Sequence, residues 1–132
     1  RGKVAGLLHA ISTQPSETVL CHNDLLRANR IVSAGRLWAL DWEYCAMASP
    51  WYDIAVVVNG DSLSTSDTEA LLNAYLGQAP STAQLDLLHQ YGCIYRYLEL
   101  VWYLALDNPI LGPDATEEKS TALMYCLAQR SI

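Results

Sequence analysis

The chain has 132 residues, of which 52% are hydrophobic and 17% are charged. This composition fits one compact domain, or a piece of a larger one, and excludes a disordered chain. A net charge of −6 without any Lys/Arg run argues against a general nucleic-acid partner. No signal peptide or apolar run of membrane-spanning length is recognisable, so no membrane partner is expected.

The four cysteines are widely spaced and include no C-x-x-C pair. This spacing predicts free thiols in a reducing cytosol rather than a disulfide framework, and therefore a cytoplasmic location. Cys21 precedes His22, but no second close pair completes a set of zinc ligands, so zinc is not expected.

The first third of the chain should form a helix followed by short strands. The expected elements are a helix over the first dozen residues, a strand at 19–21, and hairpin strands at 30–33 and 36–40. Pro15 should follow the end of the helix, and Ala34-Gly35 should form the turn of the hairpin. This hairpin would return Asp41 towards Asn29.

The rest of the chain is predicted to be helical. The expected helices begin near Tyr52, after Ser66, after Ser81 and after Pro113, and the last three should end near Leu76, Leu106 and Gln129. The capping-box pattern occurs at Ser66 with Glu69 and again at Ser81 with Gln84. Gly77 and Asn108-Pro109 are typical helix ends. The predicted fold class is α+β, mostly helical, with one small β-hairpin.

The most informative segment is 22–29, HNDLLRAN, in which Asn29 follows Asp24 by five residues. Asp41 comes twelve residues after Asn29. Asp and Asn are common in turns and caps when they occur singly. Together they supply a carboxylate that can orient a hydroxyl group and oxygen ligands for Mg²⁺, which phosphoryl transfer from a nucleotide requires.

Three segments together resemble the choline/ethanolamine kinase and aminoglycoside phosphotransferase superfamily, to which thiamine kinases also belong. They are HNDLLRAN at 22–29, LDWEY at 40–44 and SPWYDIA at 49–55. The closest likeness covers about residues 19–58, and the later helices fit the helical substrate-binding lobe more loosely. The resemblance implies an ATP- and Mg²⁺-dependent phosphotransferase. Its substrate would be the hydroxyl of a small cationic alcohol such as choline, ethanolamine or thiamine, or an aminoglycoside.

The resemblance also implies roles for single residues of the loop. Asp24 would be the catalytic carboxylate, and Asn29 and Asp41 would ligate Mg²⁺. Glu43 would hold a second metal, or it would be a plain carboxylate at the end of the hairpin. His22 would support the loop backbone without acting as a base.

Other positions carry expected roles in support and binding. Asp53 would anchor the loop from the following helix, or cap that helix. Ile31 and Leu40 would contact the nucleotide. The candidate substrate-binding residues are Trp42, Glu99 and Trp102. Trp102 lies on an aromatic stripe of the long helix, and such stripes usually pack in a core.

The segment before Cys21 contains one helix and no glycine-rich phosphate loop, and its only lysine is Lys3. Residues 1–132 are therefore predicted to be the C-terminal lobe of a protein-kinase-like fold without its N-terminal nucleotide-binding lobe. Such a fragment should have little activity alone. It could self-associate through the exposed surface between the lobes. The alternative is a non-catalytic scaffold or binding protein that retains this lobe.

Overall fold

A computed structural model describes residues 2–13, 17–106 and 112–129. Its elements are α1 (Gly2–Ser12), β1 (Val19–Cys21), a 3₁₀ turn (Arg27–Asn29), β2 (Arg30–Ser33), β3 (Arg36–Ala39), β4 (Ala46–Ala48), α2 (Pro50–Gly60), α3 (Thr65–Leu76), α4 (Thr82–Ala105) and α5 (Pro113–Ala128). Most described residues are helical and the strands are short and antiparallel, so the predicted fold class is confirmed. Among the described residues, no helix is long and apolar enough to cross a membrane.

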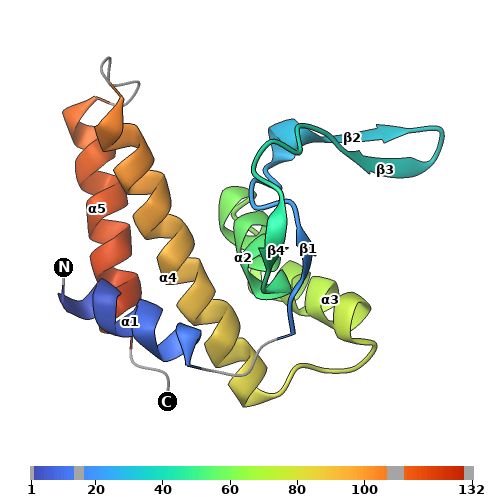
Figure 1. Cartoon of the computed structure of the whole chain (residues 1–132), viewed down its shortest axis with the longest axis horizontal. Helices are drawn as coiled ribbons and strands as arrows, with labels where there is room; N and C mark the ends of the chain where they lie inside the picture. The colour runs from blue at the N-terminus through green and yellow to red at the C-terminus, as the bar shows by residue number, and fades with distance from the viewer. Residues whose placement is uncertain (1, 14–16, 107–111, 130–132) are drawn as a thin grey trace.

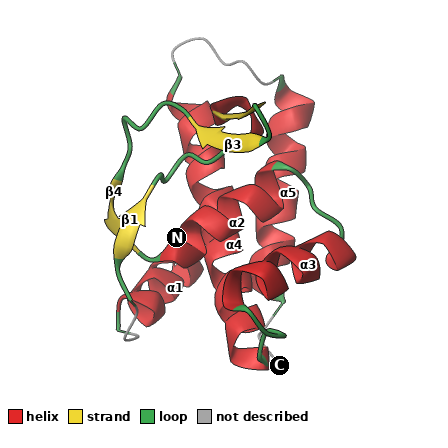
Figure 2. Ribbon diagram, turned by 90° about the vertical axis from the view of Figure 1, so that its right-hand side faces the viewer, coloured by secondary structure: helices red, strands yellow, loops and turns green. Residues whose placement is uncertain are grey.

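The helices pack around α4, which contacts α2, α5 and α1. Figure 1 shows α4 and α5 side by side, with α1 crossing near their lower ends. In the view of Figure 2, α3 lies in front of the lower part of α4. The buried core cluster joins three helices and consists of Ile54, Ala55, Leu72, Leu88 and Tyr91. Leu72 of α3 is completely buried, so the short helix α3 is fixed by its apolar face.

The β2–β3 hairpin forms as the sequence predicts, with Arg30 opposite Ala39 and Ser33 opposite Arg36. Its turn residues Ala34 and Gly35 have φ values of 51° and 72°, as a two-residue turn that matches strand twist requires. The hairpin extends away from the helices (Figure 1).

A second antiparallel pair was not predicted. β4 lies between the hairpin and the helix expected near Tyr52, where no strand was expected, and it pairs with β1 so that Cys21 is opposite Ala46. A three-residue strand gives little local signal, and β4 exists because β1 offers backbone hydrogen-bonding groups 27 residues earlier.

The predicted helix caps are partly right. Ser81 caps α4, and Gln84 returns a hydrogen bond to its backbone, so this capping box is confirmed. The box predicted at Ser66 is wrong, because Ser64 caps α3 by accepting a hydrogen bond from the amide of Asp67. Pro15, Asn108 and Pro109, expected at helix ends, lie outside the described residues; α1 ends at Ser12 and α4 at Ala105.

The prediction of four free thiols is wrong for two cysteines. Cys93 of α4 and Cys126 of α5 form a disulfide. They are 33 residues apart in sequence, but the pairing of the two helices brings their Cα atoms to 5.8 Å. Cys21 is free and buried, and Cys45 is free and exposed.

Candidate active site

The backbone of the loop that follows β1 is held by Asp53. Oδ2 of Asp53 accepts a hydrogen bond from the amide of His22, and Oδ1 accepts one from the amide of Asn23, both at 2.7 Å. Ser49 occupies the N-cap of α2, so Asp53 lies inside the first turn and its carboxylate is directed to the loop. Two charge-assisted hydrogen bonds, both accepted by this one side chain, fix the course of the segment. Asn23 takes a φ of 64° there.

His22 joins the loop to the end of the hairpin. The ring is 2% exposed, and its Nε2 lies 2.7 Å from the carbonyl oxygen of Leu40. Nδ1 accepts a hydrogen bond from the amide of Asp24 at 3.3 Å. Both contacts are satisfied by the neutral tautomer with its proton on Nε2. His22 therefore fixes backbone on both sides of the site and has no ring nitrogen free for proton transfer.

Asp24 and Asn29 meet directly, as their spacing suggests. Nδ2 of Asn29 donates to Oδ2 of Asp24 at 2.8 Å and to the Asp24 carbonyl oxygen at 2.9 Å. The side-chain oxygen of Asn29, Oδ1, receives no hydrogen bond from the described residues and can bind a cation. The second carboxylate oxygen of Asp24 is likewise unpartnered within the described ranges, so it can accept a proton from a hydroxyl group.

Asp41 and Glu43 follow strand β3 of the hairpin in the chain. The amide of Leu40 donates to the Asn29 carbonyl oxygen at 2.8 Å, which places Asp41 next to the 3₁₀ turn. Asp41 has a φ of 60°, in the left-handed region that Asp tolerates better than most residues. The negative charge of Glu43, with smaller effects of burial and of Asp24 and Asp41, raises the pKa of Tyr44. The three carboxylates therefore lie close enough to this exposed phenol for their charges to act on it.

These residues have the right chemistry for Mg²⁺, because carboxylate and amide oxygens are its preferred protein ligands. The candidate ligands are the side-chain oxygen of Asn29 and the carboxylates of Asp41 and Glu43. Among the described ranges, the one group of three His, Cys, Asp or Glu side chains close enough to share an ion lies elsewhere, on α4 and α5.

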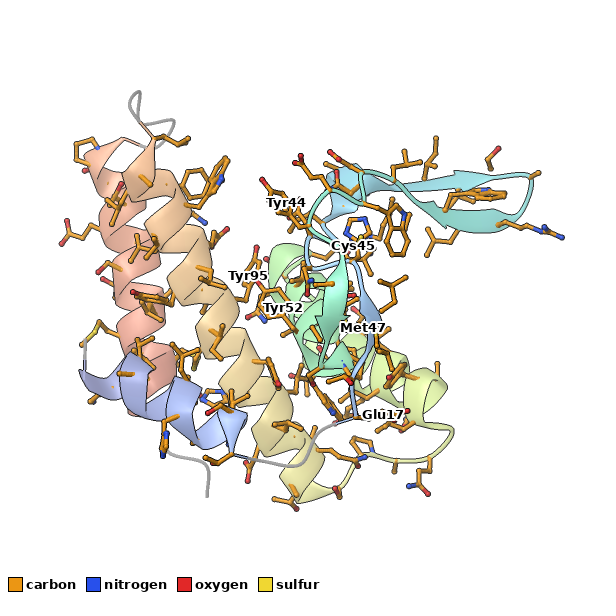
Figure 3. All side chains as sticks on the ribbon, in the orientation of Figure 1. Glu17, Tyr44, Cys45, Met47, Tyr52 and Tyr95 are labelled. Carbon is orange, nitrogen blue, oxygen red and sulfur yellow. A yellow bond between two sulfur atoms is a disulfide. The ribbon has the colours of Figure 1, made fainter. Side chains whose placement is uncertain are left out.

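Two tyrosines lie where the loop faces α4. Tyr95 belongs to the aromatic stripe of the long helix, whereas the sequence assigned no role to Tyr52. Figure 3 shows Tyr52 of α2 beside Tyr95 of α4, with Tyr44 above them. Burial, followed by the charges of Asp24 and Asp53, raises the pKa of Tyr52 to about 12. Burial and then Glu99 raise the pKa of Tyr95, whose hydroxyl donates to Glu99 at 3.4 Å. Both phenols are therefore neutral at physiological pH.

Glu99 and Trp102, both expected to bind substrate, differ in their contacts with the rest of the protein. Oε1 of Glu99 is 2.8 Å from Nζ of Lys119, so α5 already supplies it with a cation. Through Tyr95, Glu99 is connected to the tyrosines beside the loop. Trp102 is 53% exposed and its ring contacts Tyr103 on the same helix.

Trp42, Ile31 and Leu40 lie at the hairpin end of the site. The Trp42 ring lies 4.8 Å from that of His22, and its Nε1 donates to the Ala39 carbonyl oxygen. This indole supports the loop, and 45% of it remains exposed. Ile31 and Leu40 are each 48% exposed, so they offer apolar surface beside the loop.

An ion pair that the sequence did not reveal fixes the base of the hairpin. Nη2 of Arg30 contacts both carboxylate oxygens of Asp61, at 2.6 and 2.5 Å, and both side chains are mostly buried. Asp61 lies just beyond α2 and 31 residues from Arg30. Pairs at such separations leave no local signal in the sequence.

Residues 6–88 of the chain match the phosphotransferase enzyme family. This is more than half of the chain, and the chain belongs to that family. The predicted resemblance to choline/ethanolamine kinases and aminoglycoside phosphotransferases is confirmed.

The most similar relatives include the protein LicA of Haemophilus influenzae, which is 31% identical over 87 residues. That match covers 64% of this chain and 33% of LicA, so the chain spans about a third of its curated relative. A choline/ethanolamine kinase family protein of Mesorhizobium loti has a crystal structure that superposes with a TM-score of 0.81 and 25% identity, over 97% of this chain and 44% of that one. LicA in complex with AMP superposes with a TM-score of 0.79 at 23% identity, over 97% and 45% of the two chains.

Proposed function

We propose that residues 1–132 form the C-terminal catalytic lobe of an ATP- and Mg²⁺-dependent kinase for a small amino-alcohol such as choline, ethanolamine or thiamine. The observation that carries this proposal is the pairing of Asp24 with Asn29 on a loop whose backbone Asp53 holds. The family membership and the choline/ethanolamine kinase relative support it.

In this proposal Asp24 is the catalytic residue. Its free carboxylate oxygen accepts a hydrogen bond from the substrate hydroxyl and orients that oxygen towards the γ-phosphate. The bond from Asn29 fixes the other oxygen, so the carboxylate cannot rotate away. Asn29 and Asp41 would hold Mg²⁺, and Glu43 would add an oxygen ligand or bind its water. Mg²⁺ held by these residues would supply positive charge that offsets the negative charge of the nucleotide phosphates.

The nucleotide would lie against the exposed apolar side chains of Ile31 and Leu40. The AMP complex of LicA supports a nucleotide site in this fold. The alcohol would enter between the loop and α4, where neutral phenol rings can hold a cationic group through their faces. We assign this contact to Tyr52 and Tyr95, and Glu99, which is paired with Lys119, supports Tyr95 by accepting its hydrogen bond.

Residues of the β2–β3 hairpin support the proposal that another part of the protein covers this region. Val32 and Leu37 are 72% and 67% exposed, and Trp38 is 51% exposed. An N-terminal lobe would bury them, and without it this surface would favour self-association. A cytoplasmic location stays a prediction, and the Cys93–Cys126 disulfide weakens the argument from free thiols on which it rested.

The test measures transfer of labelled γ-phosphate from Mg-ATP to choline, ethanolamine, thiamine and one aminoglycoside. It compares the full-length protein that contains this chain, the 132-residue chain, and the full-length variants Asp24→Asn and Asp86→Asn. We expect transfer to one amine by the full-length protein and little by the chain alone. Asp24→Asn should reduce the rate at least ~100-fold, as loss of a positioned proton acceptor does. Asp86→Asn is a matched change on α4 and should leave the rate unchanged.

Each contrary outcome has a distinct meaning. Robust turnover by the 132-residue chain would refute the statement that it needs a second lobe. Full activity of Asp24→Asn would refute the catalytic assignment. Binding of ATP without transfer to any acceptor would favour the non-catalytic scaffold.

A further inference from the structure

A cluster of metal-ligating side chains connects α4 to α5 away from the loop. His89 and Cys93 are four residues apart on α4, so they share one face of the helix, and Cys126 faces them from α5. Nε2 of His89 lies 3.7 Å from Sγ of Cys93 and 3.1 Å from the carbonyl oxygen of Cys126. The ligand atoms of the three residues lie within 4.8 Å of one another. One imidazole nitrogen and two sulfur atoms thus lie close enough together to hold one ion.

Two cavities adjoin this cluster of side chains. A cavity of about 410 Å³ is lined by His89, Cys93 and Cys126 together with Gln90, and a second of about 350 Å³ is lined by His89 and Cys126. The side-chain oxygen of Gln90 is buried and has no hydrogen-bond partner in the described part of the chain. A buried acceptor without a partner costs stability unless water or a ligand satisfies it. A water in the cavity that Gln90 lines together with the cluster would be a suitable donor.

We propose that in the reduced protein His89, Cys93 and Cys126 bind one thiophilic divalent cation, with Zn²⁺ as the best fit. Two thiolates and an imidazole are preferred zinc ligands, and a water completes four-fold coordination. The disulfide is the oxidised, metal-free form of the same site. A dithiol reductant gives two electrons and two protons to the Sγ–Sγ bond and becomes a disulfide itself. The cation then replaces the two thiol protons.

The charges around the cluster agree with this assignment. Two thiolates and a neutral imidazole carry a charge of −2, which balances the cation. Lys3 and Arg96, which line the two cavities, therefore face a neutral complex and do not oppose binding. The ligand pattern also explains why the sequence concealed the site. His89 and Cys93 form a helical i, i+4 pair, and the third ligand comes 33 residues after Cys93.

The test uses Co²⁺ as a spectroscopic substitute for Zn²⁺, because cobalt bound to thiolate has an intense charge-transfer band. The full chain is reduced with a dithiol, freed of reductant without air, and titrated with Co²⁺. We expect the band to saturate at one ion per chain and to disappear when Zn²⁺ is added. The oxidised protein should show no band, and reduction should restore it, which tests the site without any substitution.

Variants identify the ligands. Cys93→Ser, Cys126→Ser and His89→Ala should each lose most of the band. Cys45→Ser and His9→Ala remove an exposed thiol and an exposed imidazole and should keep it. Circular dichroism establishes that each variant is folded. The proposal is overturned if the reduced wild-type chain gives no thiolate band, or if the band persists in a folded Cys93→Ser/Cys126→Ser double variant.

Discussion

The helical core of this molecule and the edge formed by the Asp24 loop and the β2–β3 hairpin are held together by different kinds of interaction. In the core, Leu72 and Val56 are 0% and 1% exposed, whereas Val32 and Leu37 of the hairpin are 72% and 67% exposed. The edge is fixed by polar contacts between side chains and backbone, chiefly those of Asp53 and His22. Burial thus stabilises the scaffold, and directional hydrogen bonds position the loop while leaving its carboxylates accessible.

The largest effect should come from Leu72→Ala in the core. Removing a fully buried leucine side chain leaves a cavity and costs about 2–5 kcal/mol. The measurement is urea unfolding followed by circular dichroism. A loss below about 1 kcal/mol would mean that α3 does not depend on this contact, and the contrast between the regions would fail.

Asp53→Ala should be the most damaging change at the edge that carries the Asp24 loop. It removes both acceptors of the His22 and Asn23 amides, and we expect a loss of about 3 kcal/mol. Asp53→Asn keeps one acceptor and should lose less. Glu69→Ala, an exposed acid on α3, serves as the control and should change stability by less than about 0.5 kcal/mol. Equal effects of Asp53→Ala and Glu69→Ala would show that the loop is fixed by something else.

The Arg30–Asp61 ion pair should stabilise the β2–β3 hairpin more than it stabilises the helices. Asp61→Asn leaves a mostly buried guanidinium without its charge partner, with an expected cost of about 2 kcal/mol. Hydrogen exchange should quicken at the amides of β2 and β3 and remain unchanged in α4. Arg36→Ala, at the far end of the same hairpin, is the matched control. Faster exchange throughout α4 would contradict a local role.

Because of Tyr52, the stability of the folded protein should depend on pH in the alkaline range. Its folded pKa of about 12 lies above the ordinary value of 10.0, so the folded protein retains a proton that the unfolded chain releases. This stabilisation is complete below pH 10 and is lost as the pH rises through 12. Its size is on the order of 1 kcal/mol after allowance for partial exposure. Unfolding of Tyr52→Phe between pH 9 and 12 should show a smaller decline than that of wild type. Exposed Tyr125→Phe is the control, and an unaltered decline in Tyr52→Phe would contradict the assignment.

What the sequence predicts well is what depends on neighbouring residues. The Ala34-Gly35 turn and the Ser81–Gln84 capping box are local, and both are confirmed. The contact of Asp24 with Asn29 also follows from a short spacing. The strand β4 and the Cys93–Cys126 disulfide depend on pairing between distant segments, so they were not predicted.

Parts of the site follow the same rule. Asp53 could be assigned to the loop only through the family resemblance, because 31 residues separate it from His22. Tyr52 was passed over, since one tyrosine in a helical first turn gives no sign that α4 will bring Tyr95 beside it. The one available signal was its position directly before Asp53. Trp42 could be placed near the loop, but its packing on His22 depends on the positive φ of Asp41 and the turn that follows.

The smallest effect should come from Leu37→Ala, which repeats the Leu72 substitution on the hairpin. Leu37 lies opposite Val32 on a surface that water already reaches, so only a cross-strand contact is lost. We expect a change of about 0.5 kcal/mol or less in urea unfolding of the 132-residue chain. Because the deleted atoms are the same, the difference between the two variants isolates burial from side-chain chemistry. A loss approaching that of Leu72→Ala would mean that copies of the chain cover the hairpin in solution. That loss would then depend on protein concentration, since dilution would separate the copies.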